Sequence, residues 1–328
     1  MVGVVLVVCL LISPTRPVAH ELPKSTAAGP KIVTTTALWA DLVTGVTCDD
    51  QANVKTLMPS GADPHGYQPS LADRAVLEGA DLVVMNGLLE EGLQVMIRSV
   101  EEVGTEVFRS TDHVETLSFN GDHGHIGVDP HVWMDPVRVS EVLPKLTKRI
   151  IEVGRLNPTT LQACLDRTQA VLAEVDAEIR ELVAGVPEAS RMLVTNHASL
   201  SYFADRYGFE VIGNIIPATS TLAAVSPAHL EQLGERMKAS GASVIFVEAG
   251  QASADAKALA KHVGGVRVVE IFTGGLPEND PWVTGYVEVL RTNARLITEA
   301  LLGESDNSKH DEHGRSHDEN SRAVLSPE

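Results

Sequence analysis

Residues 157–185 read NPTTLQACLDRTQAVLAEVDAEIRELVAG, and this stretch decides the architecture that we expect. Apolar residues recur in it at the spacing of one helical face: Leu161, Leu165, Leu172, Val175 and Ile179. Pro158 is well suited to the first position of a helix, and Gly185 is a typical helix stop. The pattern therefore predicts one uninterrupted helix of about seven turns.

Short apolar runs rich in β-branched residues alternate with helical patterns on both sides of this helix. Four runs precede it, at 31–35, 53–58, 81–85 and 105–108, and four follow it, at 192–195, 209–212, 244–247 and 266–271. Such alternation predicts parallel sheets. The fold class is therefore α/β, with two parallel-sheet lobes joined by one long, rigid linker helix that favours small hinge motions.

The ends of the chain differ in composition from the lobes. Residues 1–12 are almost continuously apolar but too short to span a bilayer, which is typical of a signal peptide, although no Lys or Arg precedes the run. A buried N-terminal strand is the alternative. We predict a signal peptide at 1–28, an N-terminal lobe at 29–156, the linker helix at 157–187, a C-terminal lobe at 188–303 and a disordered tail at 304–328. The signal peptide predicts an extracytoplasmic location, in the periplasm or at the cell surface.

The overall composition excludes one class of partner. The 328 residues are 44% hydrophobic, enough for two cores, and carry a formal net charge of -18. A chain this acidic is not expected to bind nucleic acid, because binding requires cationic groups that neutralise phosphates. Outside the predicted signal peptide the cysteines are Cys48 and Cys164. They either form one disulfide in an oxidising compartment or are two small buried side chains.

Three histidines lie in three short sequence contexts. His65 is in DPHGY (63–67), His131 is in DPHVWMDP (129–136), and His197 is in VTNHASL (194–200), directly after a predicted strand. A single Asp-Pro-His is more often an ordinary turn. The repeated tripeptide together with a third loop favours a nitrogen-rich site, suited to zinc or a related divalent metal.

Five further histidines lie in polar segments. His310, His313 and His317 are in the acidic tail, and His123 and His125 flank Gly124 shortly before His131. Histidine-rich tracts bind metal loosely, because a flexible segment must be ordered to chelate. We expect weak auxiliary metal sites here; solvated surface histidines are the alternative.

These motifs together resemble the solute-binding proteins of zinc and manganese ABC importers. The resemblance covers 32–302, and its most specific blocks are LMPSGADPH (57–65), GADLVVMNG (79–87), DPHVWMDP (129–136) and VTNHASLSYFADRYG (194–208). It implies a monomeric binding protein, not an enzyme, that delivers zinc, or alternatively manganese, to an ABC transporter permease. The stretch IPATSTL (216–222) is similar to a zinc-specific branch that works with a separate metallochaperone.

The resemblance also implies a ligand set between the lobes. His65 and His131 would come from the N-terminal lobe and His197 from the C-terminal lobe. The family adds an aspartate after the last strand, but this chain has Gly274 there, so the fourth ligand is open. The candidates are a water molecule and three carboxylates: Glu248, Glu278 and Asp280. A site dominated by histidine favours zinc over manganese, which prefers more oxygen ligands.

Two other functions compete with metal capture. A zinc hydrolase also uses three protein ligands and an open position, with Glu248 as the general base. The chain, however, has no His-Glu-x-x-His pattern and no nucleophile elbow. A surface adhesin is the second alternative, because some proteins of this family carry adhesin names.

Overall fold

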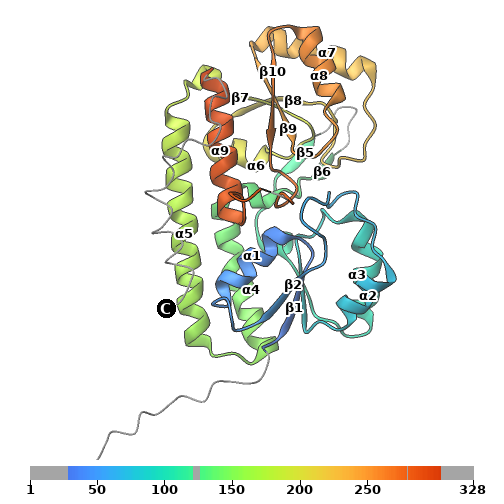
Figure 1. Cartoon of the computed structure of the whole chain (residues 1–328), viewed down its shortest axis with the longest axis vertical. Coiled ribbons are helices and arrows are strands. Elements are labelled where there is room, and N and C mark those ends of the chain that lie inside the picture. Colours follow the sequence, from blue (N-terminus) through green and yellow to red (C-terminus); the bar gives the residue numbers. More distant parts are fainter. Residues whose placement is uncertain (1–28, 121–125, 279, 304–328) are drawn as a thin grey trace, which may run out of the picture.

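The N-terminal lobe is built on a four-stranded parallel sheet. The computed structural model describes residues 29–120, 126–278 and 280–303 (Figure 1). The sheet has the strand order β2-β1-β3-β4, from Lys31–Thr34 (β1), Asn53–Thr56 (β2), Leu82–Met85 (β3) and Val107–Arg109 (β4). The helices α1 (Ala37–Val46), α2 (Leu71–Glu78) and α3 (Gln94–Glu102) connect these strands, with short 3₁₀ turns at Glu91–Leu93 and Ser110–His113. Strand β3 is buried along its whole length, as expected for a central parallel strand.

The C-terminal lobe repeats this plan. Its parallel sheet has the order β10-β9-β7-β8, from Met192–Thr195 (β7), Glu210–Asn214 (β8), Val244–Glu248 (β9) and Arg267–Ile271 (β10). The helices are α6 (Ser201–Tyr207), α7 (Pro227–Ser240) and α8 (Ala254–Val263), and a 3₁₀ turn at Glu188–Ser190 precedes β7. The predicted α/β class with two parallel sheets is therefore confirmed.

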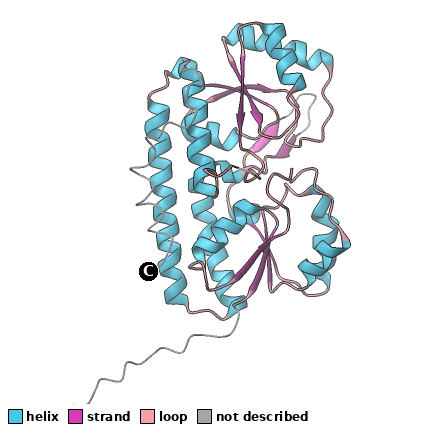
Figure 2. Cartoon of the chain, viewed as in Figure 1, coloured by secondary structure: helices cyan, strands magenta, loops and turns pink. Residues whose placement is uncertain are grey.

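Three long helices lie along one side of both sheets (Figures 1 and 2). They are α4 (Pro136–Gly154), α5 (Pro158–Ala184) and α9 (Tyr286–Leu302). Helix α5 has 27 residues and is the predicted linker helix. It begins where the Asn157 side chain accepts hydrogen bonds from the backbone N–H groups of Thr159 and Thr160, and it is capped at its other end by Gly185. At a rise of 1.5 Å per residue it is about 40 Å long, enough to follow both lobes.

The hydrophobic core is continuous between the lobes. One cluster of buried side chains extends from Trp39 in α1 through Leu172 and Ile179 in α5 to Phe246 in β9 and Tyr286 in α9. The outer faces of the two sheets have smaller clusters of their own. The lobes are thus packed on a shared helical layer, which agrees with a stiff connection. The exact lobe boundaries stay a prediction.

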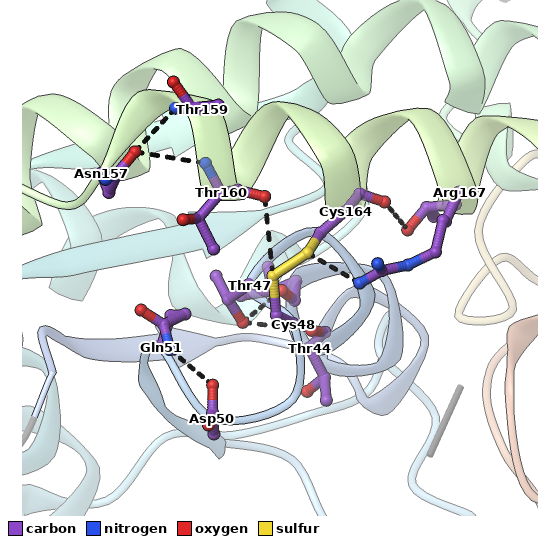
Figure 3. The surroundings of a disulfide bond; sticks show 12 residues. Thr44, Thr47, Cys48, Asp50, Gln51, Asn157, Thr159, Thr160, Cys164 and Arg167 are labelled. Atoms are coloured by element: carbon purple, nitrogen blue, oxygen red, sulfur yellow. Dashed lines mark hydrogen bonds between the residues drawn. A yellow bond between two sulfur atoms is a disulfide. The ribbon is translucent and has the colours of Figure 1, made fainter. Parts of the chain in front are cut away.

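A disulfide joins the N-terminal lobe to the linker helix (Figure 3). Cys48 lies in the turn after α1 and Cys164 in the second turn of α5, with their Cα atoms 5.5 Å apart. Cys164 is buried, and the guanidinium of Arg167 donates a hydrogen bond to its Sγ. The two cysteines were expected to be either a disulfide or two buried thiols, and in the structure they form the disulfide.

A small antiparallel hairpin, β5 (Ser118–Asn120) with β6 (Ile126–Val128), and a 3₁₀ turn at Val132–Met134 complete the described elements. Within the described ranges no helix combines the length and the apolar character needed to cross a membrane. The predicted signal peptide, the predicted tail and the five auxiliary histidines (His123, His125, His310, His313 and His317) lie outside the described residues.

Candidate metal centre

The three histidines singled out in the sequence meet between the two lobes. His65 follows β2, His131 follows β6 and His197 follows β7, so each lies beyond the carboxyl end of a strand. Strands β2 and β7 belong to the parallel sheets, which bind ligands at that edge, whereas β6 belongs to the antiparallel hairpin. The side chains of the three histidines are only 1–3% exposed. The Nε2 atom of His131 lies 3.4 Å from that of His65 and 3.2 Å from that of His197.

These histidines are the group with metal-ligating geometry in the part of the chain that the structure describes. One nitrogen from each lies within 4.8 Å of the other two. Neutral imidazoles can hydrogen-bond to one another at these distances, but each also has a nitrogen lone pair that can bind a metal ion. The arrangement is therefore able to hold one small cation.

Asp63 and Asp129 fix the two histidines of the N-terminal lobe. Each is the aspartate of an Asp-Pro-His tripeptide, and its Oδ1 accepts the backbone N–H of the histidine two residues later, at 2.9 Å in both cases. Asp129 also lies 2.8 Å from Nδ1 of His131. A carboxylate only accepts hydrogen bonds, so the proton of His131 resides on Nδ1 and Nε2 is left to bind a cation. No role for these aspartates was predicted from the sequence, although the repeated motif was the available signal.

Buried polar groups also hold the Asp129–Pro130 segment in place. The side-chain amide of Asn86 donates to the carbonyl of Pro130 at 2.8 Å, and the hydroxyl of Tyr202 donates to the carbonyl of Asp129 at 2.7 Å. Tyr202 belongs to α6 of the C-terminal lobe. The position of His131 therefore depends on both lobes, as expected for a ligand set that is completed by their contact.

His197 follows the buried strand β7 and is held through its main chain. The hydroxyl of Thr195 donates to the carbonyl of His197 at 2.7 Å. Its ring is fixed less firmly, because the nearest carboxylate oxygen, Oε2 of Glu248, lies 3.9 Å from Nδ1. That separation is too long for a hydrogen bond.

Burial keeps two of the three imidazoles neutral. Loss of solvent, and then the proximity of His131, lower the pKa of both His65 and His197 below the ordinary value. A metal ligand must be a neutral imidazole, so these side chains need not lose a proton to bind at neutral pH.

Glu248 occupies the space that Gly274 leaves open. It ends β9, Gly274 follows the neighbouring strand β10, and a Cβ atom added to Gly274 would overlap Oε1 of Glu248. The residue is 7% exposed. Burial, and next the negative charge of Asp63, raise the pKa of Glu248 to about 7. A buried carboxylate next to three histidines is costly to ionise without a cation.

The other two carboxylate candidates lie apart from the histidine group. Glu278 is exposed, and Oδ1 of Asp280 accepts the backbone N–H groups of Trp282 and Val283. Asp280 therefore has a structural role in the turn that leads to α9. Of the three carboxylates considered, Glu248 is the one buried beside a histidine of the site.

Comparison with known proteins assigns the chain to a family. Residues 32–300 match the family described as "Zinc-uptake complex component A periplasmic". The chain is 24% identical over 284 residues to the manganese ABC transporter substrate-binding lipoprotein PsaA of Streptococcus pneumoniae, covering 85% of this chain and 91% of that protein. It is also 24% identical to the iron ABC transporter substrate-binding lipoprotein MtsA of Streptococcus pyogenes serotype M1, covering 83% of this chain and 88% of that protein.

Solved structures agree in fold. The periplasmic zinc-binding protein TroA of Treponema pallidum superimposes with a TM-score of 0.76 at 26% identity, over 84% of this chain and 99% of that chain. The manganese-bound periplasmic metal-binding protein of Candidatus Liberibacter asiaticus superimposes with a TM-score of 0.74 at 21% identity, over 83% of this chain and 99% of that chain, a likeness of fold. The match over 32–300 is decisive: this chain belongs to the family of substrate-binding proteins of metal ABC importers, which are not enzymes.

Proposed function

We propose that this protein captures Zn²⁺ outside the cytoplasm and delivers it to the permease of an ABC importer. The observation that carries the proposal is the group of three buried histidines with ligating nitrogens within 4.8 Å of one another. The extracytoplasmic location is supported by relatives named as periplasmic proteins or lipoproteins and by the signal peptide predicted at 1–28. A metallochaperone partner, a monomeric state and the adhesin alternative stay predictions.

In this proposal His65, His131 and His197 are ligands, and Glu248 is the fourth. The carboxylate of Glu248 lies beside the His197 ring in the space of the missing aspartate. We expect its flexible side chain to turn toward the ion when zinc binds. A cation there also removes the cost of the buried charge. Three nitrogens and one oxygen in a tetrahedral shell suit zinc, whereas manganese and calcium prefer more oxygens. Relatives are named for manganese and iron, so the choice of metal is the part to be tested first.

The test is a competition titration of the stripped protein with Zn²⁺ and Mn²⁺ against a chelator of known affinity. His65→Ala, His131→Ala and His197→Ala should each weaken zinc binding by at least about 100-fold, because each removes one ligand of the shell. His262→Ala is the matched control, since His262 is exposed on α8. If any two of the three site variants bind zinc like the wild type, the site is wrongly assigned; tighter binding of Mn²⁺ than Zn²⁺ would contradict the choice of metal.

A further inference from the structure

Residues 216–222, which we call the strap, run from the loop that carries His197 to the loop that carries His65. The strap follows β8 and is attached at its start to the loop that carries His197. The backbone N–H of Ile216 donates to the carbonyl of Asn196 at 2.7 Å, and that of Ala198 donates to the carbonyl of Ala218 at 2.9 Å. The start of the strap thus moves with the His197 loop.

The far end of the strap contacts the loop that carries His65. The hydroxyl of Thr221 donates to Oδ2 of Asp63 at 2.6 Å, and these residues are 158 positions apart in the sequence. Oδ1 of the same carboxylate accepts the backbone N–H of His65. Leu222 is 61% exposed and lies near Gly66, where an added Cβ would be 3.8 Å from its Cδ2. A single carboxylate therefore orients a ligand histidine and binds the strap of the opposite lobe.

A second contact between the lobes is made mainly by buried side chains. The indole N–H of Trp133 donates to the carbonyl of Thr273 at 3.0 Å, and the hydroxyl of Tyr286 donates to the carbonyl of Trp133 at 2.7 Å. Trp133 and Tyr286 are 2% and 0% exposed. The backbone N–H of Gly61 adds a hydrogen bond to the carbonyl of Leu276 at 2.9 Å. Separating this second contact would disrupt the continuous core, whereas moving the far end of the strap would break the hydrogen bond from Thr221 to Asp63 and displace the exposed Leu222.

We infer that the strap is the gate through which the ion leaves, and that the hydrogen bond from Thr221 to Asp63 keeps it closed. The inference rests on the proposed function, because it assumes that the cation lies among the three histidines. Neither residue is a ligand in this proposal; both act by positioning the strap. Loss of the bond should raise the population of the open state and so the rate of release.

The experiment measures release of Zn²⁺ from the loaded full chain after mixing with an excess of chelator. Thr221→Val keeps the shape of the side chain and removes the hydroxyl, so zinc should leave about tenfold faster, the size of one hydrogen bond to a charged group. Thr221→Ser keeps the hydroxyl and should release at about the wild-type rate. Thr219→Val is the matched control, because the described structure shows no hydrogen bond of the Thr219 hydroxyl. Melting of the metal-free proteins establishes that each variant is folded.

Three results would overturn the inference. Thr221→Val overturns it by releasing zinc at the wild-type rate, and Thr219→Val does so by accelerating release equally. A wild-type protein that retains no zinc refutes the proposed function and the gate together. Normal zinc retention in the wild type with an unchanged rate in Thr221→Val refutes the gate alone.

Discussion

The two halves of the site each pair a buried carboxylate with a histidine, and the pairs differ. In the N-terminal half, Asp129 lies 2.8 Å from Nδ1 of His131 and also accepts its backbone N–H. In the C-terminal half, Glu248 lies 3.9 Å from Nδ1 of His197, beyond hydrogen-bond distance. The first carboxylate orients the ring of its histidine, whereas the second makes no hydrogen bond to its histidine and is the one proposed to bind the cation. The N-terminal half of the site is therefore preorganised, and we expect the C-terminal half to be stabilised most when a cation binds.

The strongest test of this difference removes the charge from each carboxylate in turn. Glu248→Gln should weaken zinc binding by about 100-fold or more because it removes a ligand, whereas Asp129→Asn should cost about tenfold because it affects only ring orientation. Competition titrations of both variants measure these values. Equal losses would mean that Glu248, like Asp129, only supports its histidine.

The same two variants should differ in the stability of the metal-free protein. The pKa of Glu248 is raised to about 7, so its contribution to stability is present below its unfolded pKa and is lost as the pH rises through about 7. At about pH 8, Glu248→Gln should therefore raise the free energy of unfolding by about 3 kcal/mol, the free energy that corresponds to raising a pKa from 4.5 to about 7. Denaturant melts of the stripped protein at about pH 8 measure this, and Asp129→Asn should give no gain because it replaces the charged acceptor of the His131 hydrogen bonds by a weaker, neutral amide oxygen.

Moving the carboxylate from position 248 to position 274 tests the comparison further. Gly274→Asp alone should weaken zinc binding, since its Cβ overlaps Oε1 of Glu248 and two carboxylates would share one space. Glu248→Ala combined with Gly274→Asp restores the aspartate that the family pattern has and should regain about tenfold over Glu248→Ala alone. A double variant no better than Glu248→Ala would show that position 274 does not face the ion.

A smaller effect on zinc affinity is expected when the pH is lowered. Below about pH 7, Glu248 of the metal-free protein is protonated and zinc must displace that proton, so affinity should fall up to about tenfold per pH unit between about pH 7 and pH 6. His65 and His197 add little to this slope, because their lowered pKa values leave them already neutral. Calorimetry in buffers of different ionisation enthalpy counts the released proton. In Glu248→Gln the slope should flatten; an unchanged slope would assign it to the histidines.

The smallest effect is expected from deleting residues 305–328. All four ligands proposed here come from the lobes, so the tight zinc site should be unchanged and only weak binding at excess zinc should be lost. A truncated chain that loses tight binding would show that the tail supplies a ligand.

Most of the fold could be predicted from the sequence because its signals are local. The apolar run of β7 and the periodic pattern of α5 each specify their own element, and the repeated tripeptide marked His65 and His131. No local signal in the sequence is enough to distinguish Glu248 from Glu278 and Asp280 as the fourth ligand. The distinction depends on β9 lying next to β10, which brings Glu248 opposite a glycine. A glutamate that ends a fully buried strand was the one available signal.

The bond between Thr221 and Asp63 was not predictable for the same reason. It joins residues 158 positions apart, and nothing in the sequence of either segment points to the other as its partner. Contacts of this kind arise only when the lobes are assembled, and the hairpin of β5 and β6 was missed because its strands are three residues long and carry no clear alternation.

The disulfide allows a chemical test of the cellular compartment in which the chain folds, with no fusion or tag. Cys48 and Cys164 close a loop of 116 residues, a cross-link worth about 4–5 kcal/mol when formed. Chains that fold in an oxidising compartment should resist thiol alkylation at these positions until they are reduced, whereas chains retained in the cytoplasm should be alkylated at once upon unfolding. Counting the alkylated cysteines of the protein taken from cells therefore separates exported from retained molecules.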